Sequence, residues 1–155
     1  MLRYEFPVDA AVKALKFRRK LYYAPAFVRV LLESRELLPD DLDAVLPVPL
    51  HWRREARRGF NQALELAKPV AKALDLPLLK TVRRRKATLY QSGLRADARR
   101  RNLQDAFDVR KNLCCRHVLI IDDVTTTGAT LLQLAKTLQR SGVEKVSALT
   151  LAEAQ

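Results

Sequence analysis

A run of four apolar residues at 118–121, Val-Leu-Ile-Ile, constrains the fold of this chain more than any other feature. Uniformly apolar and rich in β-branched residues, it predicts a strand whose two faces are both covered, as in parallel sheets. Residues 129–140 repeat leucine and alanine at helical spacing, and Gly142 follows where a helix commonly ends. A second strand is expected at 145–151. Strand, helix and strand in this order predict a right-handed βαβ unit and an α/β fold built on a mainly parallel sheet.

The rest of the chain supplies further elements of the same fold. Residues 1–40 form a helical amino-terminal part, and 43–50 predict a short buried strand ended by Pro47 and Pro49. Residues 60–74 carry apolar side chains three and four apart and predict an amphipathic helix. Shorter strands are expected at 78–82 and 106–109.

The length and net charge of the chain limit the number of domains and the classes of protein that it can belong to. With 155 residues, 48% of them hydrophobic, the chain can form a single domain over 1–155 without disulfides or a structural metal. Lys and Arg number 29 against 17 Asp and Glu, a net charge of +12, which excludes an acidic, solvating chain. The excess of positive charge favours polyanionic partners, whether nucleic acid, anionic lipid or phosphorylated small molecules.

The cysteines and the apolar runs predict the compartment. Cys114 and Cys115 are adjacent, and we expect reduced thiols rather than a disulfide framework or a zinc site. Charged residues interrupt the first ten positions, so no signal peptide is expected there. No apolar run approaches the ~20 residues of a membrane helix. The sequence therefore predicts a cytoplasmic protein without membrane insertion.

The segment 122–130, Asp-Asp-Val-Thr-Thr-Thr-Gly-Ala-Thr, carries the chemistry. It leaves the carboxyl end of the predicted strand, where open α/β sheets bind ligands, and enters a helix amino terminus whose free N–H groups favour an anion. The threonines add hydroxyl donors, and Gly128 permits a close backbone approach. Asp122 and Asp123 suit sugar hydroxyls or a Mg²⁺ shared with phosphates. Together they predict a site for a ribose 5-phosphate.

Other phosphate-binding loops are excluded by their missing residues. No Gly-Lys-Ser/Thr of a Walker A loop exists in the chain, and the glycine spacing of a dinucleotide-binding fingerprint is absent.

Basic residues gather in three places. The cluster at 13–20 is interpreted as the solvated face of a helix. Four arginines lie at 51–58, and eight basic residues lie at 83–101. Between the two halves of the last cluster, residues 85–98 are polar and lack an apolar period, which predicts a mobile loop.

At residues 120–130 the sequence resembles the type I phosphoribosyltransferases, whose motif for 5-phosphoribosyl-1-pyrophosphate (PRPP) is an apolar strand, two acids and a Thr/Gly-rich turn. Further segments are similar to the ComF/GntX family of phosphoribosyltransferase-like proteins. These are Val-Pro-Leu-His at 48–51, Arg-Arg-Gly-Phe-Asn-Gln-Ala at 57–63, Gln-Ser-Gly-Leu at 91–94, Arg99, Arg-Asn-Leu at 101–103 and Ala-Phe at 106–107. The resemblance covers residues 4–152.

The resemblance implies a role for each matching position. Asp122 and Asp123 would bind the ribose hydroxyls of PRPP, directly or through Mg²⁺, as catalytic and metal-binding residues. The 5-phosphate would be held by Thr125, Thr126, Thr127, Gly128, Ala129 and Thr130. The turn at 47–53, with Pro49, His51 and Arg53, takes the place of the pyrophosphate loop. The segment 83–101, with Arg85, Lys86, Gln91 and Arg99, takes the place of a hood that closes over PRPP.

Two departures from the family pattern narrow these expectations. Relatives usually carry an amino-terminal, cysteine-rich, zinc-ribbon-like module, which is missing here, so the chain is expected to be a short form or a fragment. Purine-salvage relatives place a carboxylate where this chain has Thr126, so purine salvage loses support.

Three functions are open from the sequence. The first is an enzyme that uses Mg²⁺ and transfers phosphoribosyl from PRPP to an unidentified nitrogen acceptor, releasing pyrophosphate. The second is a non-catalytic PRPP sensor. The third is a basic protein that binds single-stranded DNA or the competence machinery, as the association of ComF with DNA uptake and natural competence implies. A second copy of the chain, forming a homodimer, is a further candidate partner.

Individual side chains outside the motif carry weaker expectations. His51 is expected either to contact phosphate or to lie exposed in its loop, and His117 to be structural. Trp52 and Tyr90 are expected to be packed or partly buried rather than to stack on a base. Asn61 is expected to cap a helix or brace the pyrophosphate turn.

Overall fold

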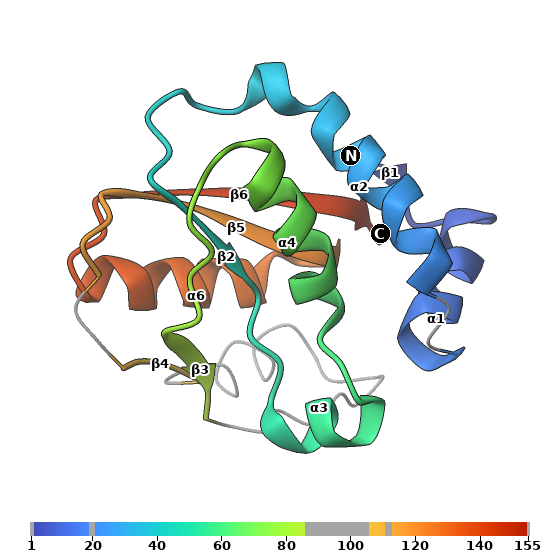
Figure 1. The fold of residues 1–155 in the computed structure, drawn as a ribbon. Helices are drawn as coiled ribbons and strands as arrows, with labels where there is room; N and C mark the ends of the chain where they lie inside the picture. Colours follow the sequence, from blue (N-terminus) through green and yellow to red (C-terminus); the bar gives the residue numbers. More distant parts are fainter. Residues whose placement is uncertain (1, 19–20, 86–105, 111–112, 155) are drawn as a thin grey trace.

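The computed structural model describes residues 2–18, 21–85, 106–110 and 113–154. Its main sheet has four parallel strands in the order β1-β6-β5-β2 (Figure 1). These are β1 (Leu2–Arg3), β2 (Ala44–Pro47), β5 (His117–Thr125) and β6 (Lys145–Glu153). The α/β fold with a mainly parallel sheet is therefore confirmed.

Strand β5 lies inside the sheet, between β6 and β2. Its residues 118–121 are fully buried, because side chains of alternate residues enter the cores on the two faces of the sheet. The strand is longer than predicted: Asp122 and Thr125 still pair with Thr150 and Glu153 of β6. The acids were expected to end the strand, but the strand continues through them because the backbone of β6 supplies hydrogen-bond partners up to Thr125.

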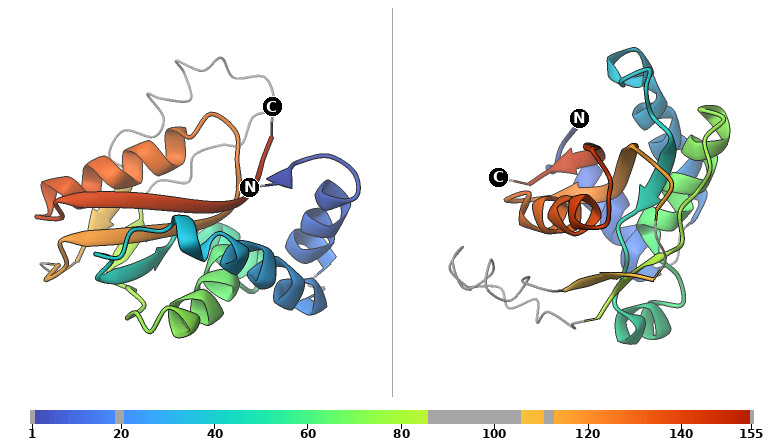
Figure 2. Two further views of the ribbon diagram at one scale, coloured as in Figure 1. Left: turned by 90° about the horizontal axis from the view of Figure 1, so that it is seen from above. Right: turned by 90° about the vertical axis from the view of Figure 1, so that its left-hand side faces the viewer.

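Helices cover both faces of this sheet (Figure 2). On one face lie α2 (Ala24–Glu33) and α4 (Gln62–Ala73), and on the other lies α6 (Ala129–Arg140), at the predicted bounds. The first core contains Leu31, Leu66 and Leu119, and the second contains Ile120, Leu134 and Leu138. The sheet thus separates two apolar layers.

The amino-terminal part is mostly helical, as predicted. It contains α1 (Val8–Arg18), the 3₁₀ turns η1 (Leu21–Tyr23) and η2 (Arg35–Leu37), and α2. Strand β1 was not predicted, since two residues carry no periodic signal; it forms because β6 offers an open edge. Helix α1 lies near the carboxyl end of β6 (Figure 1) and buries Val12 and Leu15 in the first core.

A small second sheet pairs β3 (Val82–Arg84) with β4 (Phe107–Val109) in antiparallel fashion. The predicted strand at 78–82 is therefore displaced: Leu78 makes only a single bridge to Val45, and the pairing strand begins at Val82. The reason is tertiary, because Phe107 and Ala106 supply both the partner strand and the apolar cover for Val82.

The arginine-rich segment after β2 forms a short helix, α3 (Trp52–Arg58), which was not predicted. His51 caps its amino end, and Gly59, with φ of 80°, ends it in the left-handed region that glycine favours. Within the described residues no helix has both the length and the apolar character needed to cross a bilayer.

Candidate functional site

The two acids of the motif lie side by side near the carboxyl end of β5. Asp122 Oδ1 accepts the backbone N–H of Asp123 at 2.9 Å, and Asp123 Oδ1 accepts that of Val124 at 2.8 Å. Because side chains alternate along a strand, the two carboxyls start from opposite faces of the sheet. Each is therefore reached by a different set of neighbours.

The pKa of Asp122 is raised well above its ordinary value. Burial of the carboxyl is the largest cause, and the neighbouring charge of Asp123 adds to it, while Lys16 acts in the opposite direction. Part of the Asp122 surface still reaches solvent. A carboxyl held in this way gains most from a hydroxyl donor or a cation that arrives with a ligand.

Lys16 of α1 contacts the other acid. Its Nζ lies 2.9 Å from Asp123 Oδ2, and the two side chains are 19% and 8% exposed. No other donor among the described residues forms a hydrogen bond to that oxygen. The expectation that the 13–20 cluster is a solvated face is therefore wrong for Lys16. Lys13, one turn earlier, does lie in solvent, paired with Asp9.

The threonine turn follows β5 directly. Thr125 ends the strand, Thr126 and Thr127 are exposed, and Gly128 has φ of 67° at the start of α6. A Cβ at Gly128 would meet no atom within 4 Å, so the backbone angle, and not space inside the protein, favours glycine there. Ala129 and Thr130 open α6, whose first N–H groups have no helical acceptor. Exposed hydroxyls and N–H groups without a helical acceptor are the donors that an anion-binding turn requires.

The turn at 47–53 lies beside the acids because β2 pairs with β5, with Pro47 opposite Ile121. Val48 donates its N–H to the carbonyl of Ile121 at 2.9 Å. Asn61 Nδ2 donates to the carbonyl of Val48 at 3.1 Å, while its Oδ1 accepts the N–H of Ala63. The prediction that Asn61 caps a helix and braces this turn is confirmed.

His51 is buried, with 4% of its surface exposed, so the expectation of an exposed loop histidine is wrong. Nδ1 accepts the N–H of Arg53 at 3.3 Å, and Nε2 lies 3.2 Å from the carbonyl of Arg85. Both ring nitrogens are engaged within the protein, with Nε2 as the donor. His51 thus fixes the shape of the turn, while Arg53 extends into solvent.

Sequence reasoning missed the position of one arginine. Arg84 of β3 is largely buried, with its guanidinium carbon 5.5 Å from the ring centre of Phe107. Burial, and then the charge of Arg54, lower the pKa of Arg84 to about 10, while Asp122 acts to raise it. Arg84 therefore lies within electrostatic reach of Arg54 and of Asp122. Within a run of arginines, no sequence signal distinguishes this one.

Of the predicted hood at 83–101, only residues 83–85 lie within the described part of the chain. Arg85 pairs with Asp108 at 2.8 Å, which joins the start of the segment to β4. Lys86, Gln91 and Arg99, together with Tyr90, lie outside the described residues.

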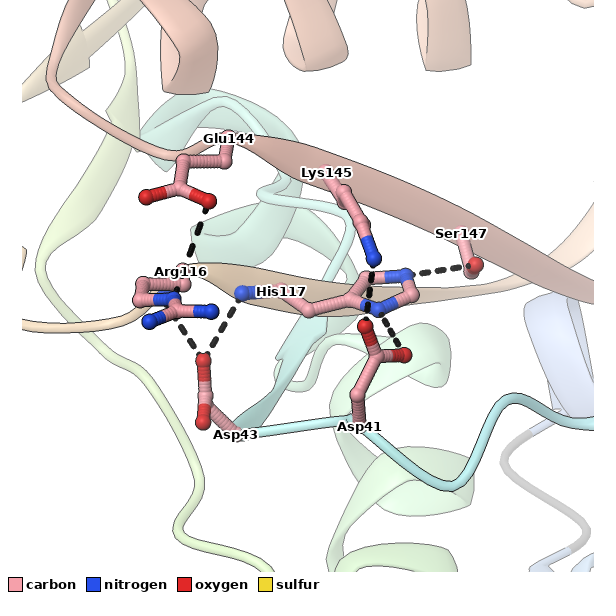
Figure 3. Close-up of polar contacts among 7 residues, drawn as sticks. All are labelled: Asp41, Asp43, Arg116, His117, Glu144, Lys145 and Ser147. Atoms are coloured by element: carbon pink, nitrogen blue, oxygen red, sulfur yellow. Dashed lines mark hydrogen bonds and ion pairs between the residues drawn. The ribbon is translucent and has the colours of Figure 1, made fainter.

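A second polar network occupies the opposite end of the sheet (Figure 3). His117 Nδ1 lies 2.7 Å from Asp41 Oδ1, and Nε2 lies 2.9 Å from Ser147 Oγ. This resembles a hydrolase relay, but Lys145 binds the same carboxylate at 2.7 Å, and lowers the pKa of Asp41 to about 2 together with His117. The cavity of about 300 Å³ beside it is not lined by Ser147. We interpret the network as structural, as predicted for His117.

The residues present at the acidic pair fit a magnesium ion. Among the described residues no group of three or more His, Cys, Asp or Glu could hold a metal alone. Magnesium is commonly bound by one or two carboxylates that share it with substrate phosphates and water. Asp122 and Asp123 match that donor set, with Asp123 Oδ2 held within the described residues only by the ion pair to Lys16.

Comparison with known proteins identifies the family and agrees with the fold. Residues 61–155 match the family model described as a phosphoribosyl transferase domain, and the chain belongs to that family. Among solved structures, orotate phosphoribosyltransferase from Aeropyrum pernix has the same fold, with a TM-score of 0.50, 18% identity, and coverage of 83% of this chain and 70% of the other.

Curated relatives of the chain point to a narrower group of proteins. The chain is 38% identical to "Competence protein F" of Haemophilus influenzae, over 96% of this chain and 69% of that protein. It is 38% identical to "DNA utilization protein YhgH" of Escherichia coli O157:H7, over 92% of this chain and 66% of that protein. The chain thus spans about two thirds of the length of these relatives, and the expected ComF/GntX relationship is confirmed.

Proposed function

We propose that this chain binds PRPP with Mg²⁺ and transfers its phosphoribosyl group to a nitrogen acceptor. The observation that carries the proposal is the continuity of the site: two acids lie near the carboxyl end of a buried strand, and a hydroxyl-rich turn with a left-handed glycine leads directly into a helix amino terminus. The acids would hold the ribose hydroxyls, and the turn at 125–130 would hold the 5-phosphate. Magnesium, when bound, would screen the phosphate charge.

The turn at 47–53 and Arg84 are suited to the leaving group. In the transfer, the bond from C1′ of the ribose to the pyrophosphate oxygen breaks, pyrophosphate leaves with the electron pair, and C1′ bonds to the acceptor nitrogen, which releases a proton. Arg84, which lies within electrostatic reach of Arg54 and Asp122, would supply positive charge to the departing pyrophosphate. No covalent intermediate with the protein is needed, so positioning supplies most of the rate.

The remaining expectations are parts of the same proposal. A hood at 83–101 would close over PRPP and exclude water from the reacting carbon. A cytoplasmic location suits the free thiols of Cys114 and Cys115 and a phosphorylated substrate.

The test is a calorimetric titration with PRPP, with and without Mg²⁺. Replacing both Asp122 and Asp123 by Asn should weaken PRPP binding roughly a hundredfold or more, since each charged hydrogen bond contributes about 1.5–3 kcal/mol. The matched control is Glu33→Gln with Glu36→Gln, which raises the net charge equally at two exposed acids far along the chain. Near-native PRPP affinity in the double Asn variant would overturn the proposal.

A pyrophosphate-release assay then separates an enzyme from a sensor. With PRPP bound, an enzyme releases pyrophosphate in the presence of one of a series of amines and nucleobases. Binding without release across the whole series would identify the sensor alternative.

A second candidate function, contact with single-stranded DNA, is favoured by one specific observation. Trp52, at the start of α3, is 63% exposed, contrary to the expected packing, and the guanidinium of Arg53 lies 5.3 Å from its ring centre. A cavity of about 680 Å³ beside it is lined by Trp52, Lys80 and Arg83, among others. Aromatic surfaces flanked by arginine are typical of single-strand binding. The names of the relatives, competence and DNA utilization, agree with this candidate.

Fluorescence anisotropy with a short labelled oligothymidine tests this candidate. Trp52→Ala should weaken binding roughly 5- to 150-fold, since stacking on one base contributes about 1–3 kcal/mol. Tyr22→Ala is the control, because Tyr22 is also 63% exposed but lies on η1. Equal losses in both variants would assign the effect to general stability, and no loss would remove Trp52 from the interface.

A further inference from the structure

The ion pair between Lys16 and Asp123 joins the amino-terminal helix to the acidic pair of the site. Helix α1 is fixed by Val12 and Leu15, both fully buried, so Lys16 emerges from an anchored turn. Its ammonium group reaches Asp123 Oδ2 at 2.9 Å, and both side chains are largely buried. Through Lys16, α1 thus contacts the acidic pair in addition to covering the core.

Few other groups near Asp123 Oδ2 compensate the negative charge of the carboxylate. The other carboxylate oxygen, Oδ1, accepts the N–H of Val124, and apart from Lys16 no donor among the described residues reaches Oδ2. A carboxylate that is 8% exposed next to a second acid needs positive charge close by. Lys16 supplies that charge from within the chain.

A divalent cation at the same carboxylate would meet the ammonium group. Two positive charges a few ångströms apart repel strongly where water is largely excluded. The lysine side chain has four flexible carbons, so the ammonium can leave without any movement of α1. Cation binding and the Lys16 ion pair therefore oppose each other.

We propose that Lys16 is a resident counter-ion of Asp123 that a divalent cation must displace, so that Lys16 sets the affinity of the acidic pair for that cation. The inference rests on the proposed function, since it takes the pair as the cation site. It makes Lys16 a positioning residue, which keeps the pair compensated until cation and ligand arrive together.

The test measures Mn²⁺ binding without PRPP, followed by the loss of the electron paramagnetic resonance signal of free Mn²⁺. Lys16→Met removes the ammonium and keeps the apolar stem. It should bind Mn²⁺ on the order of tenfold more tightly than the wild type, the range expected for a largely buried ion pair. Lys13→Met is the control, because it removes the same charge from the same helix but leaves Asp123 untouched.

Thermal unfolding of the same variants gives a second readout. Without Mn²⁺, Lys16→Met should melt below Lys13→Met, because Asp123 loses its counter-ion. With saturating Mn²⁺ the gap should close, because the cation replaces the missing charge and stabilises the folded state by mass action. A merely structural role for Lys16 would leave the gap unchanged.

Lys16→Arg keeps the charge and should keep Mn²⁺ affinity close to that of the wild type, which provides a folded comparison. Mn²⁺ binding to Lys16→Met that is no tighter than to Lys13→Met, or absent, would overturn the inference. The proposed function is judged separately, by PRPP affinity in the Asp122 and Asp123 variants.

Discussion

At the scale of the residue, the acidic pair is placed where stability alone would not place it. Asp122 and Asp123 continue a strand whose preceding four residues are fully buried, and Asp123 itself is buried. Burial and the charge of Asp123 raise the pKa of Asp122, so ionising Asp122 in the folded protein costs free energy. Such a cost is typical of groups held ready for a ligand.

This cost predicts a pH-dependent gain in stability for Asp122→Asn. An acid whose pKa is raised on folding stabilises the folded protein fully below its unfolded pKa of 3.8. This stabilisation is lost as pH rises toward the folded pKa. Asn does not titrate, so the melting temperature of the variant should exceed that of the wild type by a margin that grows from pH 4 upward. Each kcal/mol corresponds to about 2–4 °C for a chain of this size.

Melting curves at intervals from pH 4 to pH 9 would measure the margin. The exposed Asp40→Asn serves as the control for loss of one carboxylate. A margin independent of pH would contradict the raised pKa.

At the scale of the element, single polar residues determine how α3, α4 and the turn between β2 and α3 fit together. His51 begins α3 and holds the carbonyl of Arg85, which joins the turn to the end of β3. Asn61 begins α4 and holds the carbonyl of Val48. The shape of the turn therefore depends on the side chains of His51 and Asn61 as well as on its backbone.

Substitutions at Asn61 separate its two roles. Ser can still cap α4 but is too short to reach the carbonyl of Val48, whereas Ala loses both contacts. We expect Asn61→Ala to lower the free energy of unfolding by about 1 kcal/mol more than Asn61→Ser, the usual size of a helix cap. Urea denaturation measures both differences. Equal effects of Ala and Ser would show that the cap contributes little and that the brace to Val48 dominates.

At the scale of the whole molecule, the two ends of the sheet have different tasks. The carboxyl end carries the acids and the threonine turn, while the amino end is closed by the network of His117, Asp41, Lys145 and Ser147 (Figure 3). Asp123 follows His117 by six positions in β5, about 20 Å in an extended strand. The network ties the segment before β2 to β5 and β6, far from the site. The single domain over 1–155 stays a prediction.

The network predicts how acid weakens the fold. Hydrogen bonds from Lys145 and His117 lower the pKa of Asp41 from 3.8 to about 2. Asp41 therefore stabilises the folded protein above pH 4, and this stabilisation is lost as pH falls toward 2. Asp41→Asn should be less stable than the wild type at pH 5, and the gap should close by pH 2. Urea midpoints between pH 2 and pH 5 measure this gap, with Asp40→Asn as the control. A gap that persists at pH 2 would contradict the assignment.

The amino-acid sequence by itself determined the parallel α/β fold, the bounds of α6 and the motif at 122–130. Local pattern suffices there, because uniform apolar character, helical spacing and a turn of threonines and glycine are all properties of neighbouring residues. Only the tertiary structure decided that β1 joins β6, that Val82 pairs with Val109, that His51 is buried and that Trp52 is exposed. It also decided which of many basic residues reach the acids. Lys16 and Arg84 look like their neighbours in sequence, and only the packing of α1 and β3 against the end of β5 distinguishes them.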